Sequence, residues 1–509
     1  MVCEVKKIDS NSTGLRYAEE ECIGELPVTP VWYGQEPNSY NDFGGQYTMV
    51  ARNPINASRQ RKKGSITDLE ASGGYTQDVT DYNLTRLMQG FLFADARQKA
   101  TLKPFNGAQV LAGAVTSADD TYAVASGGTA FVANRLVLAS GYGVSANNGL
   151  RTVVSSTATT VVVSQALTDE AAPPASANLS VVGHQFASGD LSIVMVGGLP
   201  ALTSAAVDMT TLGLFPGEWI FVGGDATATQ FTSQIGAARV ASISTTQLVL
   251  DKVGWATPAA DAGTGKTIQL FFGTLIRNES DPMLIKRRSY DLERTLGQDA
   301  NGIQSEHLIG AVPSEFTLTV NQAELVTCDF TFVAIDHQTR TGAEGLAAGD
   351  RPDIPANMDA FNTSSDFSRI KLASVTPGNA VPAPLFAFAT ELTVTINNNL
   401  SANKAIGVLG AMEVSAGTFE VGGSATVYFA DVEATRAVRN NADVTLDILM
   451  VKKNAGLLFD IPLLTLGDGR ATVEQDQPIM LPLETAAAES AFGNTLTYMS
   501  FPYLPSIAE

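Results

Sequence analysis

The residues best suited to chemistry in this sequence form a short glycine-rich run. Ala260-Asp261-Ala262-Gly263-Thr264-Gly265-Lys266-Thr267 resembles a phosphate-binding loop with Ala in place of the first Gly. Such a loop must follow a buried strand and open a helix, so that backbone N–H groups and the helix dipole hold phosphate. Here a strand-like run, Ile268-Gln269-Leu270-Phe271-Phe272, follows instead. We therefore expect a glycine-rich turn between strands and no cofactor.

Histidine and cysteine chemistry has little support. Asp336-His337 and Glu306-His307 place an acid beside a histidine, but a catalytic or metal site needs a third partner and a cleft, so we expect surface histidines. No Gly-x-Ser-x-Gly elbow is present, and 52 carboxylates produce close pairs by chance. We expect no catalytic residues, no metal and no enzyme. The third histidine is His184. The three cysteines, Cys3, Cys22 and Cys328, form no CxxC pair, which suggests that the chain is made in a reducing compartment.

Composition excludes further classes. The chain has 509 residues, 45% of them hydrophobic, and a formal charge of −20. A protein that grips nucleic acid through its phosphates needs a surplus of Lys and Arg, which is absent here. No run approaches 18 apolar residues, and the N-terminus lacks an apolar signal-peptide core, so we expect neither a membrane span nor a signal peptide. The length predicts about three to five domains.

One amphipathic helix stands out near the N-terminus. Its apolar residues follow the i, i+3, i+4, i+7, i+8 spacing of a single stripe, which we expect to pack on a sheet, with Thr80 as the N-cap. The stripe consists of Leu84, Leu87, Met88, Phe91 and Leu92.

A polar stretch from Gly34 to Ser65 precedes this helix and is too long for an ordinary turn. Its cations are Arg52, Arg59, Arg61, Lys62 and Lys63. Two interpretations stand equally: a solvated loop, or an electrostatic latch onto an acidic copy of the same chain.

Residues 106–265 have the character of an insertion. They hold only 10 acids and 4 bases, and they are rich in Ala, Gly, Ser, Thr and Val. A pattern of short β-branched strands and Gly or Asn turns recurs at an offset of about 85 residues, from Leu136–Val163 to Trp219–Leu250. The sequence therefore predicts two small all-β modules.

The C-terminal part predicts strands with one buried face, because apolar and polar residues alternate there. Examples are Phe316, Leu318 and Val320; Cys328, Phe330 and Phe332; Leu392, Val394 and Ile396. A short helix is expected at 433–440. Both outer parts place a helix between strands, so without the insertion the chain could hold two copies of one α+β domain.

Several stretches share their arrangement with one known family. They are the basic loop, strand and helix of Arg59–Arg97, the segment from Phe272-Gly273-Thr274-Leu275 through Lys286-Arg287-Arg288-Ser289-Tyr290, and the "Gly-Ala, then strand" element of Leu308–Val320. The units around Asn147-Asn148-Gly149 are similar to small β modules that decorate phage tubes. On these residues the chain resembles the major tail tube protein of a long-tailed, non-contractile (siphovirus-type) bacteriophage.

The resemblance implies a mainly β (α+β) fold: a tail-tube β-sandwich or barrel domain, duplicated, with an inserted pair of small all-β modules. The expected division is tube domain 1 at 1–105 and 266–345, outward-facing modules at 106–265 (about 106–183 and 184–265), and tube domain 2 at 346–509. Six tube domains per ring is the family pattern. Rings would then be homotrimers with pseudo-sixfold symmetry if each chain holds two, or homohexamers if it holds one.

The function implied is mechanical. Stacked rings would form the tail tube in the virion, assembled in the host cytoplasm, and would hold the tape-measure protein and then conduct DNA into the host. Partners would be further copies of the chain, tail terminator and distal tail proteins, and DNA in transit without specific binding; no membrane is implied. An acidic wall would repel phosphates, so that DNA slides. The Gly34–Ser65 loop is the candidate contact between rings.

Three alternatives remain open on the sequence. A capsid or capsid-decoration protein would also be acidic and strand-rich. A carbohydrate-binding surface adhesin would use the β modules as binders and should expose aromatic platforms, yet the insertion has few aromatic residues. An enzyme is disfavoured by the scarcity of His and Cys.

Overall fold

The structure, a computed structural model, describes residues 13–55, 57, 60–299, 302–355, 358–386, 388–430 and 432–509. Cys3 and Arg59 lie outside these residues. Strands dominate this part of the chain, which confirms the expected mainly β fold. Two α-helices form within it, α1 (Thr85–Phe91) and α2 (Glu433–Arg439), the second where the sequence predicts it. Neither of these helices, nor any other described one, is long and apolar enough to span a membrane.

The chain folds as two compact units, and it passes between them several times. The first unit comprises Met1–Ala94, Ile285–Ala360 and Thr390–Ala425, and the second comprises Asp95–Leu284, Phe361–Ala389 and Thr426–Glu509. These limits differ from the predicted boundaries after residues 105, 265 and 345, and the division into tube domains stays a prediction.

The first unit is built around the long strand β19. This strand pairs antiparallel with β18 and β21 along its first half and with β20 and β23 along its second. The strands of this unit are β1 (Gly14–Glu19), β2 (Tyr33–Gln35), β3 (Ser39–Ala51), β4 (Gly64–Asp78), β18 (Tyr290–Asp299), β19 (Gly302–Asn321), β20 (Thr327–Ala334), β21 (Asp336–Gly342), β23 (Ala389–Asn397), β24 (Ser401–Asn403) and β25 (Glu413–Ser415), with β26 (Glu420–Tyr428) crossing its limit.

Helix α1 is held by an aromatic core against β19 and β20. The five stripe residues, from Leu84 to Leu92, are at most 2% exposed. The Phe91 ring centroid lies 5.8 Å from that of Phe316 and 5.6 Å from those of Phe330 and Phe332. A side chain at Gly90 would stand 2.6 Å from the Tyr290 hydroxyl, so glycine permits this close approach.

Thr80 is not the N-cap of α1, contrary to the prediction. The helix begins at Thr85, and its N-cap position, Leu84, makes no side-chain capping bond. Thr80 instead forms a reciprocal pair with Asn83: the Asn83 backbone N–H donates to the Thr80 hydroxyl, and the Thr80 N–H donates to the Asn83 carbonyl oxygen. This pair closes the turn before the helix. The Thr80 hydroxyl is therefore already hydrogen-bonded to Asn83, ahead of the helix start at Thr85, and does not cap the helix.

In the second unit, the inserted region forms one antiparallel sheet. Its strand order is β11-β12-β15-β14-β13-β16-β10-β7-β8-β9-β6-β5. The strands are β5 (Ala112–Thr116), β6 (Thr121–Val124), β7 (Arg135–Ser140), β8 (Gly149–Ser156), β9 (Thr160–Val163), β10 (Asn178–Gln185), β11 (Ser192–Val196), β12 (Leu199–Thr203), β13 (Trp219–Val222), β14 (Gly236–Ile243), β15 (Gln247–Val253) and β16 (Gln269–Phe271). The sheet reaches Phe271, beyond the predicted end at 265, and the predicted junction at 183–184 falls inside β10.

The two halves of this sheet have the same strand order and are related by local two-fold symmetry. Each strand from β5 to β10 has its counterpart, from β11 to β16, at the mirrored place in the order, and the two sets meet at the antiparallel pair β10–β16. Each set also uses one acid to hold a loop: Glu170 accepts the Gly143 N–H at 2.8 Å, and Asp261 accepts the Thr232 N–H at 3.1 Å. The recurrence in the sequence falls on these paired strands.

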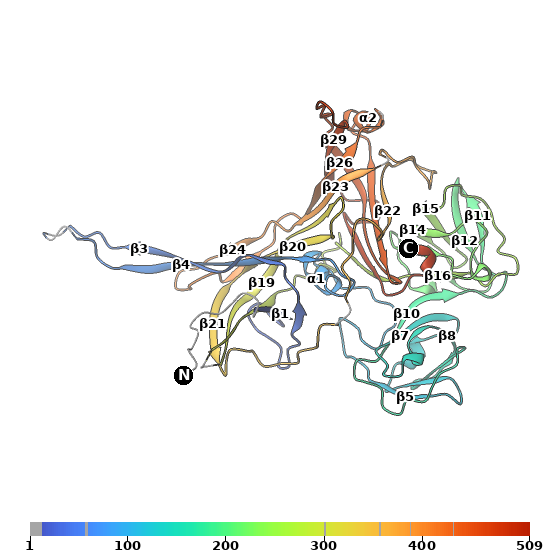
Figure 1. Cartoon of the computed structure of the whole chain (residues 1–509), viewed down its shortest axis with the longest axis horizontal. Helices are drawn as coiled ribbons and strands as arrows, with labels where there is room; N and C mark the ends of the chain where they lie inside the picture. Colours follow the sequence, from blue (N-terminus) through green and yellow to red (C-terminus); the bar gives the residue numbers. More distant parts are fainter. Residues whose placement is uncertain are drawn as a thin grey trace. The chain divides into compact units, whose positions relative to one another are not determined.

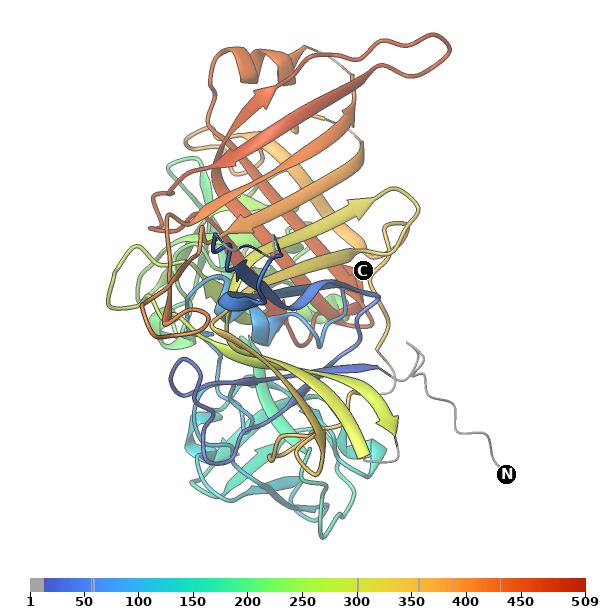
Figure 2. The same cartoon turned by 90° about the vertical axis from the view of Figure 1, so that its left-hand side faces the viewer.

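The C-terminal strands of the second unit form another sheet, around β28. It pairs with β27, β29 and β30, while β22 pairs with β27 and β17 with β30. In Figure 2 the red strands β27 and β28 run side by side. The bounds are β17 (Thr274–Arg277), β22 (Phe367–Ser374), β27 (Val444–Lys452), β28 (Ala455–Asp468), β29 (Met480–Ala487) and β30 (Thr497–Phe501).

The inserted sheet and the C-terminal sheet share a hydrophobic core. The inserted sheet contributes Trp219 and Phe271, and the C-terminal sheet contributes Leu458 and Met499, all at most 1% exposed. The insertion is therefore packed on the C-terminal strands and is not joined to them by a linker alone.

Candidate functional site

The phosphate-loop-like run forms a turn between strands, as its flanking residues predict. No helix follows Thr267; β16 begins at Gln269. The carboxylate of Asp261 already accepts the backbone N–H groups of Gly263 at 2.9 Å and Thr232 at 3.1 Å. A phosphate site would need such N–H groups to be free.

The structure does not bring the pairs Glu306-His307 and Asp336-His337 together into one site. The prediction that both histidines lie at the surface is wrong for His307. This side chain is fully buried: its Nδ1 lies 2.9 Å from Asp291 Oδ1, and its Nε2 lies 3.8 Å from Glu293 Oε2. Arg351 in turn pairs with Glu293 at 2.7 Å. The acids next to His307, Asp291 and Glu293, lie on β18, the strand paired with β19. They are distant from His307 in the sequence, so the neighbouring residue Glu306 could not indicate them. His337 is half-buried.

The predicted polar loop of Gly34–Ser65 is mostly strand, which corrects the sequence-based interpretation. Strands β3 and β4 pair from Ser39–Thr76 to Ala51–Gly64, and Figure 1 shows them as a long hairpin running away from α1. Phe43 alone is buried in β3. A ribbon with neither face buried has no apolar–polar alternation, which is why the sequence did not predict it.

Only the base of this hairpin is held in the sheet. Strand β4 pairs with β20 from Ala71 to Asp78. From Gly64 to Glu70, β3 is the one strand that pairs with it among the described residues. A two-stranded ribbon is marginally stable at best in water. The distal half therefore stands to gain most from contact with another molecule.

The distal half also exposes large apolar side chains. Met49 is 64% exposed, and four others of its kind are about half exposed or more. Soluble monomers rarely expose such side chains together, and clusters of them mark interaction surfaces. The set comprises Tyr47, Met49, Val50, Ile55 and Ile66, which we call the hairpin patch.

The predicted cations surround the tip of the same hairpin. Arg52, Arg61, Lys62 and Lys63 are exposed, and the Lys62 N–H donates to the Arg52 carbonyl oxygen across the tip. Arg59, the fifth predicted residue, lies outside the described residues. The hairpin thus carries a positive tip in a chain of net charge −20.

A second, shorter hairpin lies beside β4 and was missed by the sequence analysis. Strands β24 and β25 carry a loop whose Lys404 Nζ pairs with Asp68 at 2.5 Å, and this hydrogen bond lowers the pKa of the Asp68 carboxyl. The apolar side chains that the loop exposes, which we call the loop patch, are Ile406, Val408, Leu409 and Met412. An apolar run without strand or helix periodicity was the available signal.

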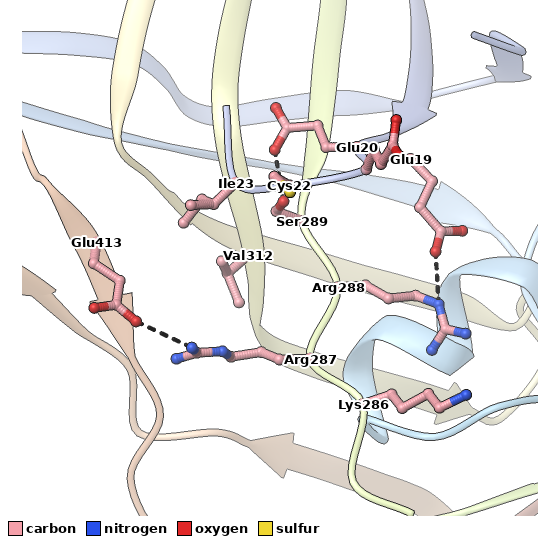
Figure 3. A pocket seen from close by; sticks show the side chains of 11 residues that line it. Glu19, Glu20, Cys22, Ile23, Lys286, Arg287, Arg288, Ser289, Val312 and Glu413 are labelled. Atoms are coloured by element: carbon pink, nitrogen blue, oxygen red, sulfur yellow. Dashed lines mark hydrogen bonds and ion pairs between the residues drawn. The ribbon is translucent and has the colours of Figure 1, made fainter. Parts of the chain in front are cut away.

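A pocket of about 410 Å³ at the foot of this second hairpin is filled with mutually paired charges. Figure 3 shows Arg287 reaching Glu413, at 3.1 Å, and Arg288 reaching Glu19, at 2.8 Å. Arg287 also donates to the Val414 carbonyl oxygen at 2.6 Å. The pairs of Arg287 with Glu413 and of Arg288 with Glu19 thus match two of the cations of this pocket, and the first of them anchors the base of β25.

Buried Glu20 completes this anchor. Burial raises the pKa of its carboxyl, which accepts hydrogen bonds from the Ser289 hydroxyl and from the N–H groups of Gly24 and Gly310. It thereby ties the turn after β1 to β19. Among the described residues, no three His, Cys, Asp or Glu side chains gather as metal ligands.

The family model of phage tail tube proteins matches residues 10–487. This chain belongs to the phage tail tube protein family. No curated protein matches it. The match covers the first unit from residue 10, the insertion, and the second unit as far as residue 487, so the tail tube protein is a structural component of a bacteriophage tail, as the resemblance implied. The capsid and adhesin alternatives lose their support. The role of the exposed β3–β4 hairpin in a tail tube protein is then the question that the structure raises.

Proposed function

We propose that this tail tube protein assembles into stacked rings that form the conduit for the tape-measure protein and for DNA, in a long-tailed, non-contractile phage. The observation that carries the proposal is the β3–β4 hairpin, whose distal half exposes the hairpin patch and has no sheet neighbour beyond its own two strands among the described residues. We assign this hairpin to the contact between rings. Its positive tip, Arg52 with Arg61, Lys62 and Lys63, suits an acidic surface on the next copy.

Removing the distal half of the hairpin tests the assignment. Residues 47–69 are replaced by Asn-Gly, which closes a two-residue turn between the paired residues Gln46 and Glu70. The variant should remain folded, because its base still pairs with β20, but it should form no tubes in negative-stain micrographs. Val28→Ser is the matched control, since Val28 is 98% exposed and lies outside both patches. Normal tubes from the deletion would refute the assignment.

The latch and the solvated-loop interpretations differ in their response to salt. A triple change of Arg61, Lys62 and Lys63 to Gln should raise the concentration needed for tubes at low salt and have little effect at high salt, where exposed charges are screened. Equal assembly of both proteins at every ionic strength would favour the solvated loop.

We further propose that each chain contributes two tube domains, so that a ring is a trimer. The order of elements supports this, because two strands, a helix and further strands follow one another in both parts. In one part these are β3 and β4, α1, and β18 to β20. In the other they are β23 and β26, α2, and β27 to β29. Native mass spectrometry of single rings distinguishes the forms, since three copies of the 53.5 kDa chain weigh about 160 kDa and six weigh about 320 kDa.

We also propose that DNA passes without specific binding, because a chain of net charge −20 supplies an acidic wall that repels phosphates. Changing several carboxylates that line the bore to Lys should slow genome delivery, measured by DNA release from purified virions. Unchanged delivery would count against an electrostatic role.

A further inference from the structure

The loop patch is a second exposed apolar surface of the first unit. Ile406 is fully exposed, and Val408, Leu409 and Met412 are each about half exposed. Large apolar side chains gathered in one short segment in this way mark interaction surfaces. Their exposure to water calls for a partner that covers them.

The backbone that carries the loop patch is held at several points. The Met412 N–H donates to the Asn403 carbonyl oxygen at 2.7 Å, and the Ala411 N–H donates to the Ile335 carbonyl oxygen at 3.1 Å. Gly410 has a φ of +87°, and a Cβ there would lie 2.5 Å from the same Ile335 oxygen, so this close approach requires glycine. The loop is therefore already ordered, and binding a partner costs it little backbone entropy.

The loop patch adjoins the hairpin patch. Lys404, at the start of the loop, pairs with Asp68 of β4 at 2.5 Å, and a Cβ at Gly410 would lie 3.5 Å from Leu69 Cδ2. Tyr47 of the hairpin patch is the β3 partner of Leu69. In Figure 1, β24 lies beside the β3–β4 hairpin. One partner surface can therefore cover both patches.

The two patches also occupy the same place in the order of elements. The hairpin patch lies at the far end of β3 and β4, the strands that precede helix α1. The loop patch lies in the connection 398–419 between β23 and β26, the strands that precede helix α2. In a chain with two copies of one domain, both patches belong to the same connection of the repeat. Equivalent connections in a symmetric ring meet equivalent surfaces.

We propose that the loop patch binds a second copy of this chain in the next ring, beside the hairpin patch. This inference rests on the proposed assembly into stacked rings and extends the contact between them. Each chain then contributes two apolar contacts to the next ring, a long hairpin and a short loop. The occupant is a copy of the chain because the loop patch continues the hairpin patch and repeats its place in the domain.

Ile406→Ser with Leu409→Ser tests the proposal. Both side chains are exposed, so the double variant should unfold at the same temperature as the parent. The concentration needed for tubes, measured by sedimentation, should rise by about tenfold or more, because two apolar side chains no longer become buried in the contact. Val28→Ser is the matched control, since Val28 is 98% exposed and lies outside both patches, and it should leave that concentration unchanged.

Native mass spectrometry of single rings separates the possible results. Loss of tubes with intact rings supports a contact between rings. If the double variant loses its rings as well, or forms tubes at the same concentration as an assembling parent, the proposal is overturned. Failure of the parent itself to form tubes would instead refute the proposed function.

A photo-crosslinker placed at the patch gives a second check. The full chain, with p-benzoylphenylalanine in place of Ile406, is irradiated once as tubes and once below the concentration at which tubes form. A band of two linked copies should appear from the tubes alone. Equal amounts of this band in both samples, or crosslinks within single chains only, would contradict the proposal.

Discussion

Asp447 in β27 is the residue whose loss should most damage the second unit. Its carboxylate is fully buried and faces two cations, Lys252 Nζ of β15 at 3.2 Å and the guanidinium of Arg369 in β22. These cations lower the pKa of Asp447 even though burial alone would raise it. Asp447→Asn removes the charge and leaves the shape nearly unchanged, so it isolates the electrostatic contribution.

The expected cost follows from what remains. Lys252 and Arg369 would lose the charged carboxylate that both contact, and breaking a buried pair in this way costs about 3–5 kcal/mol. Asp251→Asn is the matched control, because Asp251 has a 24% exposed side chain and its partner Arg239 keeps Asp460 at 3.1 Å. Because Arg239 keeps this buried counter-ion and Asp251 is partly open to water, the control should lose less stability than Asp447→Asn.

Tryptophan fluorescence can report on this unit alone. Trp219 and Trp255 lie in the second unit and are at most 5% exposed, whereas Trp32 lies in the first. In a Trp32→Phe background, urea unfolding of the parent, Asp447→Asn and Asp251→Asn gives the three free energies of unfolding. A cost for Asp447→Asn below about 1 kcal/mol, or equal to that of the control, would refute the reasoning.

Two further predictions concern pH and assembly. The unfolded state protonates His184 near its ordinary pKa of about 6.5, whereas the folded state resists to about 4, so the unfolded state binds more protons in this window and stability falls as pH drops through it. Between pH 7 and 5 His184 should remove about 2 kcal/mol, and His184→Leu should abolish that loss in urea titrations; identical slopes would contradict this. Met49→Ser with Ile66→Ser should raise the critical concentration for tubes more than tenfold, measured by sedimentation, because burying each half-exposed side chain contributes about 1 kcal/mol; an unchanged value would remove the hairpin patch from the interface.

The local elements of the fold could be predicted because each has one buried face. The stripe from Leu84 to Leu92 gave α1, and the alternation at Phe316, Leu318 and Val320 gave the second half of β19. In both, the period of the sequence matches the period of burial. Where neither face is buried, as in the distal half of β3, that signal vanishes.

The tertiary partners could not be predicted because they are distant in sequence. Lys252 and Asp447 are 195 residues apart, and nothing around either residue announces the other. The same holds for Lys404 with Asp68, and for His307, whose acids belong to the neighbouring strand. Composition shows that the net charge of the chain is negative. It does not show that some of the carboxylates are buried in ion pairs with Lys or Arg.

Some charged and apolar side chains of this protein lie where a simple monomer would not place them. Ion pairs such as Arg239–Asp460 lie buried between the inserted sheet and the C-terminal sheet, while Met49 and Ile66 face water on the hairpin. Buried ion pairs add little net stability compared with apolar packing, but they penalise every misaligned docking of two sheets, because each misalignment leaves a charge unpaired. Exposed apolar side chains tolerate small shifts and gain affinity only when a second copy covers them. The insertion is thus fixed in one orientation on its own chain, and we propose that the hairpin binds another.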